Sequence, residues 1–165
     1  MVLYFTGTGN SRYLARRIAE GLDMPLYDLN ACIKAGNTAP VQTGRDVVLV
    51  TPTYAWRIPR VVSEWLGKTA LTGAERIWFV MDCGSEIGNA AGYNRQLAAQ
   101  KHLHYMGTAQ VVMPENYIEG AGAAQDRAGI SPAERDPLRP LYERPGESGV
   151  LSLLCKSGCF PGNGC

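Results

Sequence analysis

Apolar positions along the first 118 residues fall into two alternating patterns. Short continuous apolar runs, each ended by turn residues, are typical of strands that are buried on both faces of a parallel sheet. Such runs predict strands at residues 2–5, 46–50, 76–81 and 109–113, with a weaker strand at 25–29. Between them, apolar residues spaced three or four apart predict helices at residues 11–22, from Pro59 onward and at 89–106.

The order of these elements predicts the fold class. Strand and helix alternate, apart from a loop predicted at residues 30–45, where Gly, Asn, Thr and Pro gather. Strands joined by helical crossovers form a parallel sheet with helices on both faces. The sequence therefore predicts an α/β fold, in which a doubly wound parallel sheet lies between two layers of helices. In such folds ligands bind at the carboxyl ends of the strands.

Length and charge narrow the class of protein. A chain of 165 residues suits one domain with a tail. Because the periodicity fades near residue 119, we expect a domain at residues 1–118 and an irregular, disordered or truncated tail at 119–165. The net charge of +1 gives no strong attraction to nucleic acid or to an anionic membrane. An apolar strand at residues 2–5 leaves no room for a signal peptide, so we expect a cytoplasmic protein.

Five cysteines, an odd number, fit free thiols in a reducing compartment. Three of them, Cys155, Cys159 and Cys165, lie in the predicted tail with gaps of three and five residues. A bacterial ferredoxin cluster needs the spacing Cys-x2-Cys-x2-Cys-x3-Cys, which these residues do not provide. We therefore expect unliganded cysteines there and no bound metal.

The segment Thr6-Gly7-Thr8-Gly9-Asn10-Ser11 runs from the first predicted strand directly into the first predicted helix. Its glycines let the backbone approach a ligand, its short side chains supply donors, and the helix N-terminus adds free N–H groups with a partial positive charge. This favours a phosphate site over a plain turn in which Asn10 or Ser11 only caps the helix. The loop lacks the lysine of a Walker A motif, and Arg12 stands where a dinucleotide fingerprint needs Gly or Ala. A single phosphate therefore fits better than a diphosphate.

Two further loops follow the strands at 46–50 and 76–81. The first contains Tyr54 and Trp56, whose flat rings could stack on a planar ligand, although Trp56 could equally pack onto the core. The second contains Cys83-Gly84-Ser85, which could contact the polar edge of a heterocycle or merely connect to a helix capped by Asn89. A phosphate loop, an aromatic wall and a polar edge together favour flavin mononucleotide (FMN) over ATP or NAD.

At this point the chain resembles a known family. Residues 1 to about 118 resemble a flavodoxin domain, and more narrowly the flavodoxin half of bacterial and archaeal proteins that continue into a two-cluster ferredoxin. The motifs that carry the resemblance are Tyr4-Phe5-Thr6-Gly7-Thr8-Gly9-Asn10-Ser11, Pro52-Thr53-Tyr54-Ala55-Trp56-Arg57-Ile58-Pro59, Asp82-Cys83-Gly84 and Met113-Pro114-Glu115-Asn116-Tyr117. The resemblance implies strand order 2-1-3-4-5 and FMN at the strand tips. The implied cofactor-binding residues are Thr6, Gly7, Thr8, Gly9, Asn10, Ser11, Pro52, Thr53, Tyr54, Ala55, Trp56, Cys83, Gly84 and Ser85.

The function implied by the resemblance is electron transfer, with the redox chemistry supplied by the flavin. An electron carrier is favoured over a stand-alone oxidoreductase, and the implied partner is a redox protein such as a ferredoxin-type iron–sulfur protein. Two features depart from the family: the pattern is lost after Tyr117, and Ala55 stands where flavodoxins often have a glycine that can adopt positive φ. The alternative is a cofactor-free interaction module, or a truncated remnant of a flavodoxin–ferredoxin protein.

Overall fold

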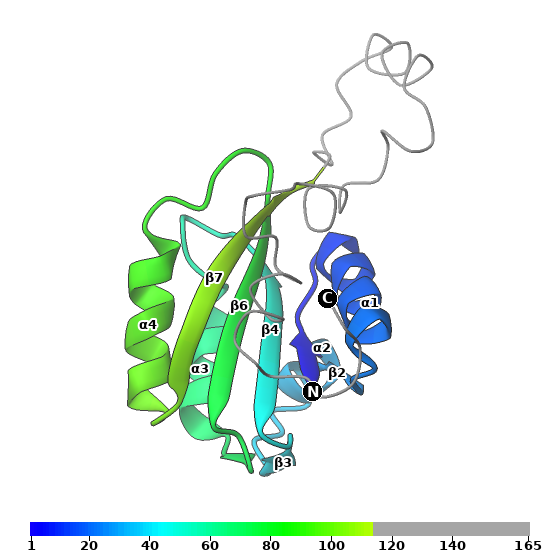
Figure 1. Ribbon diagram of the computed structural model, residues 1–165, viewed down its shortest axis with the longest axis vertical. Helices are drawn as coiled ribbons and strands as arrows, with labels where there is room; N and C mark the ends of the chain where they lie inside the picture. The colour runs from blue at the N-terminus through cyan, green and yellow to red at the C-terminus, as the bar shows by residue number, and fades with distance from the viewer. Residues whose placement is uncertain (114–165) are drawn as a thin grey trace, which may run out of the picture.

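The computed structural model describes residues 1–113 and contains a parallel sheet of five strands in the order β2-β1-β4-β6-β7 (Figure 1). In chain order the strands are β1 (Val2–Tyr4), β2 (Leu26–Asp28), β4 (Asp46–Pro52), β6 (Arg76–Cys83) and β7 (His104–Val112). Counted along the chain within this sheet, the order is 2-1-3-4-5. The predicted α/β class, parallel sheet and strand order are therefore confirmed.

Helices cover both faces of this sheet. They are α1 (Asn10–Leu22), α2 (Leu29–Lys34), α3 (Arg60–Lys68) and α4 (Ala90–Gln100). Figure 1 shows α1 on one side of the sheet and α3 and α4 on the other. A small second sheet pairs β3 (Val41–Gln42) with β5 (Leu71–Thr72). The molecule therefore has the expected three layers.

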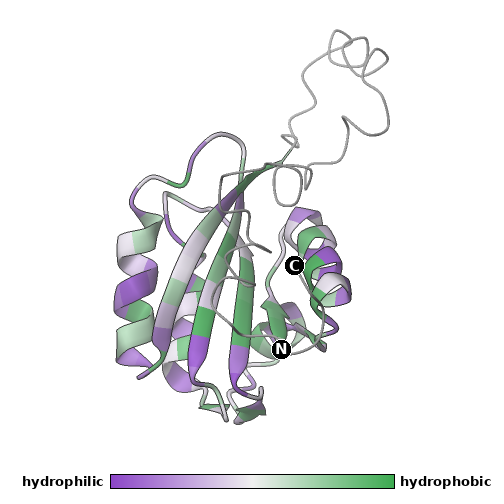
Figure 2. Cartoon of the chain, viewed as in Figure 1, coloured by the Kyte–Doolittle hydropathy of each residue, from purple (hydrophilic) through white to green (hydrophobic). Residues whose placement is uncertain are grey.

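The apolar runs become central strands because both of their faces are buried. Val48 and Val50 of β4 lie in the cluster under α1, whereas Val47 and Leu49 lie in the cluster under α2, α3 and α4. Neighbouring residues of β6 alternate in the same way, and Figure 2 shows apolar colour along the middle strands. Alternation between two apolar faces is what distinguishes these runs from half-exposed strands.

The helix predicted at 89–106 is shorter than expected. Helix α4 ends at Gln100, His102 adopts a φ of 55°, and β7 begins at His104. Gly107, which directly follows the predicted helix, lies within β7 beside a register shift against β6. The apolar residues among positions 97–106 fit the spacing of a helix and the alternation of a strand about equally well. Pairing with β6 decides in favour of a strand, because it satisfies the backbone groups of the sheet edge.

The predicted loop at 30–45 was wrong at its start, where α2 is found, and at Val41–Gln42, which form β3. The side chain of Asp28 accepts a hydrogen bond from the Asn30 amide and caps this helix. The predicted tail at 119–165, its cysteines and the motif after Met113 lie outside the described residues. Within residues 1–113, no helix is both long enough and apolar enough to cross a membrane.

Candidate functional site

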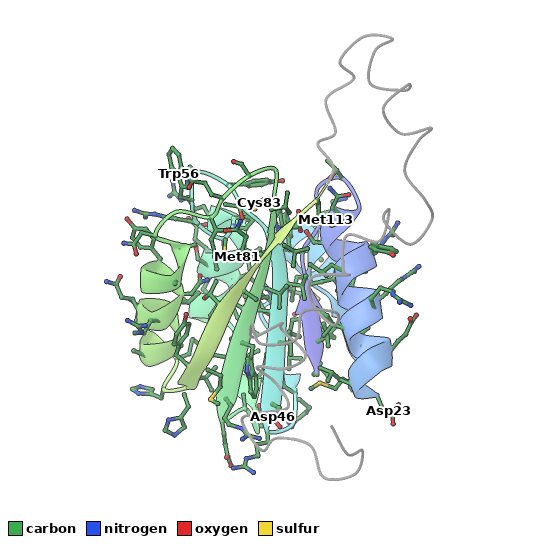
Figure 3. The ribbon with its side chains drawn as sticks, turned by 45° about the horizontal axis from the view of Figure 1, so that its top comes forward. Asp23, Asp46, Trp56, Met81, Cys83 and Met113 are labelled. Carbon is green, nitrogen blue, oxygen red and sulfur yellow. The ribbon has the colours of Figure 1, made fainter. Side chains whose placement is uncertain are left out.

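Three loops meet at the carboxyl end of the sheet, where β1, β4 and β6 end. Figure 3 shows Trp56, from the second of these loops, and Cys83, the last residue of β6, at one end of the molecule, with Asp46, at the start of β4, at the opposite end. Parallel strands bring their following loops to one edge, which is where ligands bind in open α/β sheets. The sequence prediction that these three loops share one edge is therefore confirmed.

The loop after β1 is fixed by two hydrogen bonds between Thr6 and the side chain of Asn30 on α2. The Thr6 amide donates to Asn30 Oδ1 (2.9 Å), and Asn30 Nδ2 donates to the Thr6 carbonyl (2.7 Å). Inside the loop, the Gly9 amide donates to Thr6 Oγ1 (2.9 Å). Gly9 has a φ of 110°, a conformation that L-residues rarely adopt, so a glycine is needed there. Asn30 was not predicted as a site residue, because Asp28 and Leu29 fell in the predicted strand and Asn30 in the predicted loop, whereas Asp28 caps a helix that begins at Leu29.

This loop leads into the N-terminus of α1 with its backbone donors in place. The first hydrogen bond that closes the helix runs from the Tyr13 amide to the Gly9 carbonyl (2.9 Å). In this first turn the Ser11 and Arg12 amides therefore have no carbonyl of the helix itself to bind. Gly7 and Thr8 are exposed, so a ligand can reach the loop from solvent. Loop and helix end together can hold an anion.

Ser11 points away from that anion position. Its hydroxyl donates to a carboxylate oxygen of Asp82, and the two residues are 1% and 7% exposed. Burial raises the pKa of the Asp82 carboxyl above its usual range, and the hydrogen bond from Ser11 partly opposes this. Ser11 can offer a ligand its backbone but not this hydroxyl. Asp82, which was not predicted as a site residue, places a carboxyl group beside the loop.

The loop after β4 contains a two-residue turn. The amides and carbonyls of Tyr54 and Arg57 bond each other reciprocally (2.9 and 3.1 Å), and Ala55 and Trp56 have φ values of 49° and 58°. Positive φ at both central residues is the geometry of a type I′ hairpin turn. The turn exposes Tyr54 by 50% and Trp56 by 57%. The alternative that Trp56 packs into the core is therefore wrong.

Each aromatic side chain of the turn reaches a different neighbouring loop. A Cβ atom placed on Gly88 would lie 2.5 Å from Trp56 Cδ1, so the indole rests directly on the Gly88 backbone in the loop after β6. A Cβ atom placed on Gly7 would lie 2.6 Å from the Tyr54 hydroxyl oxygen, which therefore lies over the loop after β1. The turn connects all three loops of the edge.

The guanidinium of Arg57 lies 3.6 Å from the centre of the Tyr93 ring on α4, and this cation–π contact anchors the turn. At the base of the same loop, the hydroxyl oxygen of Thr53 is buried and has no hydrogen-bond partner among the described residues. The hydroxyl oxygens of Thr51 and Thr69 and the indole nitrogen of Trp78 are also buried without a partner among the described residues, so this feature of Thr53 does not by itself indicate a ligand.

The loop after β6 presents a polar edge. Gly84 and Ser85 are exposed, and Gln110 on β7 donates to the Ser85 carbonyl (2.8 Å). Burial raises the pKa of the half-buried Cys83 thiol, and the charge of Asp82 adds to the effect. Cys83 is therefore a neutral thiol and not an activated one. Asn89 begins α4 without a capping bond from its side chain, so the simple helix-cap alternative has no support.

No protein-family model matches the chain, and no curated protein matches it in sequence. A candidate flavoprotein from Bacteroides eggerthii matches it in structure with a TM-score of 0.51 and 16% identity, covering 69% of this chain and 88% of that protein. The chain has a flavodoxin-like fold. Weaker likenesses are to reduced Megasphaera elsdenii flavodoxin (TM-score 0.46, 17% identity, 72% and 90% covered) and to Trp repressor binding protein from Bacillus subtilis (0.46, 11%, 88% and 98%). At these identities the likeness concerns the fold alone.

Two observations at the edge of this flavodoxin-like fold fit a phosphorylated planar ligand. The helix N-terminus after β1 can supply donors for one phosphate, and an exposed indole supplies a flat surface. The described residues contain no group of three His, Cys, Asp or Glu side chains that could hold a metal ion.

Proposed function

We propose that the protein binds FMN at the carboxyl edge of its sheet and acts as an electron carrier of the flavodoxin type. The observation that carries this proposal is the exposed Trp56 indole, which rests on the Gly88 backbone at the same edge of the sheet as a loop that can bind phosphate. An exposed indole offers a flat apolar surface on which a planar ring can stack. A ligand with a planar heterocycle and a single phosphate uses both features at once.

In this proposal each loop has one task. Backbone amides and threonine hydroxyls between Thr6 and Ser11 hold the phosphate, and Trp56 covers one face of the ring. The residues at Pro52, Thr53 and Ala55, together with Cys83, Gly84 and Ser85, line the remaining edge and exclude water. When bound, the flavin supplies the redox chemistry.

The surroundings of the ring would lower its reduction potential. Arg57 is the cation of the turn, and its charge is engaged over Tyr93. A site walled by an aromatic ring and a neutral thiol disfavours a negative charge on the reduced ligand. We propose that this protein is a low-potential donor. Because Trp56 and Tyr54 are exposed, a redox protein such as a ferredoxin-type iron–sulfur protein could approach the ligand closely at this edge.

Titration of the purified protein with FMN tests the proposal. We expect quenching of flavin fluorescence, a shift of the flavin absorbance bands and saturation at one FMN per chain. Trp56→Ala should weaken binding by roughly 5- to 150-fold, the range expected for loss of one aromatic stacking contact. Leu26→Ala, which removes an exposed apolar side chain from the start of β2 at the opposite end of the sheet, is the control and should bind as the wild type does. A wild-type protein that does not bind FMN would refute the proposal.

One observation favours the alternative of a cofactor-free interaction module. Asp82 places a buried carboxyl group beside the phosphate loop, and an ionised carboxylate would repel a phosphate dianion. The FMN titration separates the two functions, because the interaction module would leave flavin fluorescence unchanged at every FMN concentration.

A further inference from the structure

Tyr54 and Trp56 belong to one turn but face different ends of the proposed ligand. Trp56 rests on Gly88, in the loop assigned to the ring, whereas the Tyr54 hydroxyl lies over Gly7, in the loop assigned to the phosphate. The hydroxyl oxygen is the nearest atom to the Gly7 Cβ position at 2.6 Å, and the ring carbon Cζ follows at 4.0 Å. The oxygen of Tyr54, and not the face of its ring, therefore approaches the phosphate loop.

The Tyr54 hydroxyl can supply a side-chain hydrogen bond to a phosphate that the Ser11 hydroxyl cannot supply. The hydroxyl of Ser11 is committed to Asp82, so it is not available to a ligand. A phenol donates one hydrogen bond, and a bond to a phosphate oxygen is strengthened by the charge of the acceptor. Half of the Tyr54 surface is exposed, so the side chain can adjust to a ligand that enters from solvent.

We propose that Tyr54 is a ligand of the phosphate and a specificity-determining residue, which makes the site prefer phosphorylated flavin to riboflavin. The proposal rests on the proposed function. Under it, Trp56 alone forms the aromatic wall and Tyr54 closes the opposite end of the site.

Comparison of FMN with riboflavin tests this role, because the two ligands share the ring and differ in the phosphate. We expect Tyr54→Phe to weaken FMN binding roughly 10-fold or more, the usual effect of losing a hydrogen bond to a charged group. Riboflavin binding should stay the same, so the ratio of the two dissociation constants reports the phosphate contact. Tyr105→Phe, which removes a hydroxyl near the start of β7 at the opposite end of the sheet, is the control and should leave the ratio unchanged.

Gly7→Ala provides a second, independent variant. Its methyl group would meet the Tyr54 oxygen at 2.6 Å and displace it, whereas in the Tyr54→Phe background the nearest ring atom lies 4.0 Å away, an ordinary contact. Gly7→Ala should therefore lower the preference for FMN in the wild-type background and have little further effect in the Tyr54→Phe background. Gly67→Ala on α3, where a Cβ atom meets nothing within 4 Å, is its control.

The outcomes are distinct. Equal weakening of FMN and riboflavin by Tyr54→Phe would show that Tyr54 contacts the ring and would overturn the inference. Tighter FMN binding would show that Tyr54 obstructs the loop and would also overturn it. If the wild type binds both flavins and Tyr54→Phe leaves the ratio unchanged, this inference fails while the proposed function stands. If the wild type binds neither flavin, the proposed function itself fails.

Discussion

Replacing Gly88 with alanine should displace Trp56 and weaken flavin binding. The added methyl group would lie 2.5 Å from Trp56 Cδ1, 2.8 Å from Cγ and 3.1 Å from Cβ, distances at which the indole must move. Loss of the stacking surface is worth about 1–3 kcal/mol, which corresponds to roughly 5- to 150-fold in the dissociation constant for FMN. Gly88 also has a φ of 53°, so alanine adds a backbone cost of about 1–2 kcal/mol to the free energy of folding.

Gly36→Ala separates these two effects. Gly36 has a φ of 63°, and a Cβ atom placed on it meets nothing within 4 Å. Both variants therefore carry a similar backbone cost, and only Gly88→Ala moves the indole. We expect similar losses of stability in urea unfolding, with weaker FMN binding and altered acrylamide quenching of tryptophan fluorescence in Gly88→Ala alone. Trp65 and Trp78 are buried, so the quenching reports Trp56. Equal FMN affinities in the two variants would refute the reasoning.

Two further predictions concern residues beneath the loops. Asp82→Asn should remove part of the pH dependence of stability. Burial raises the pKa of Asp82, so the contribution of this carboxyl to stability is favourable below a pH of about 4 and is lost as the pH rises through the pKa of the folded state. Urea unfolding from pH 4 to 7 should therefore show the wild type losing stability relative to the variant. A wild type and variant whose stabilities change in parallel would contradict this. Asn30→Ala should remove both hydrogen bonds to Thr6, cost about 1–3 kcal/mol of stability and weaken FMN binding. Asp46→Ala, which breaks the ion pair with Arg76 at the other end of the sheet, is its control and should lower the melting temperature without changing the FMN affinity.

The central strands could be predicted from the sequence because their continuous apolar runs fit only one kind of structure, a strand that is covered on both faces. Continuous β-branched and aromatic residues at 46–50 and 76–81 can be buried only where both faces of a strand are covered. The boundary between α4 and β7 could not be predicted, because residues 97–106 suit a helix and a strand almost equally. Pairing with β6, a contact between distant parts of the chain, settles it.

The candidate site was predictable at the level of loops but not of side chains. Glycine, threonine and aromatic residues placed directly after the strands identified the three loops. The sequence gives no sign that the Ser11 hydroxyl turns inward, because that depends on Asp82, 71 positions away. Asn30 and Gly88 were missed for the same reason: their importance lies in what they touch across the fold.

The reciprocal bonds between Tyr54 and Arg57 make the turn a single stiff unit that touches two loops at once. The backbone that carries both rings is therefore fixed as one piece. A substitution that opens the turn, such as Ala55→Pro, is expected to move Tyr54 off Gly7 and Trp56 off Gly88 together, so both ends of the site depend on one short backbone segment.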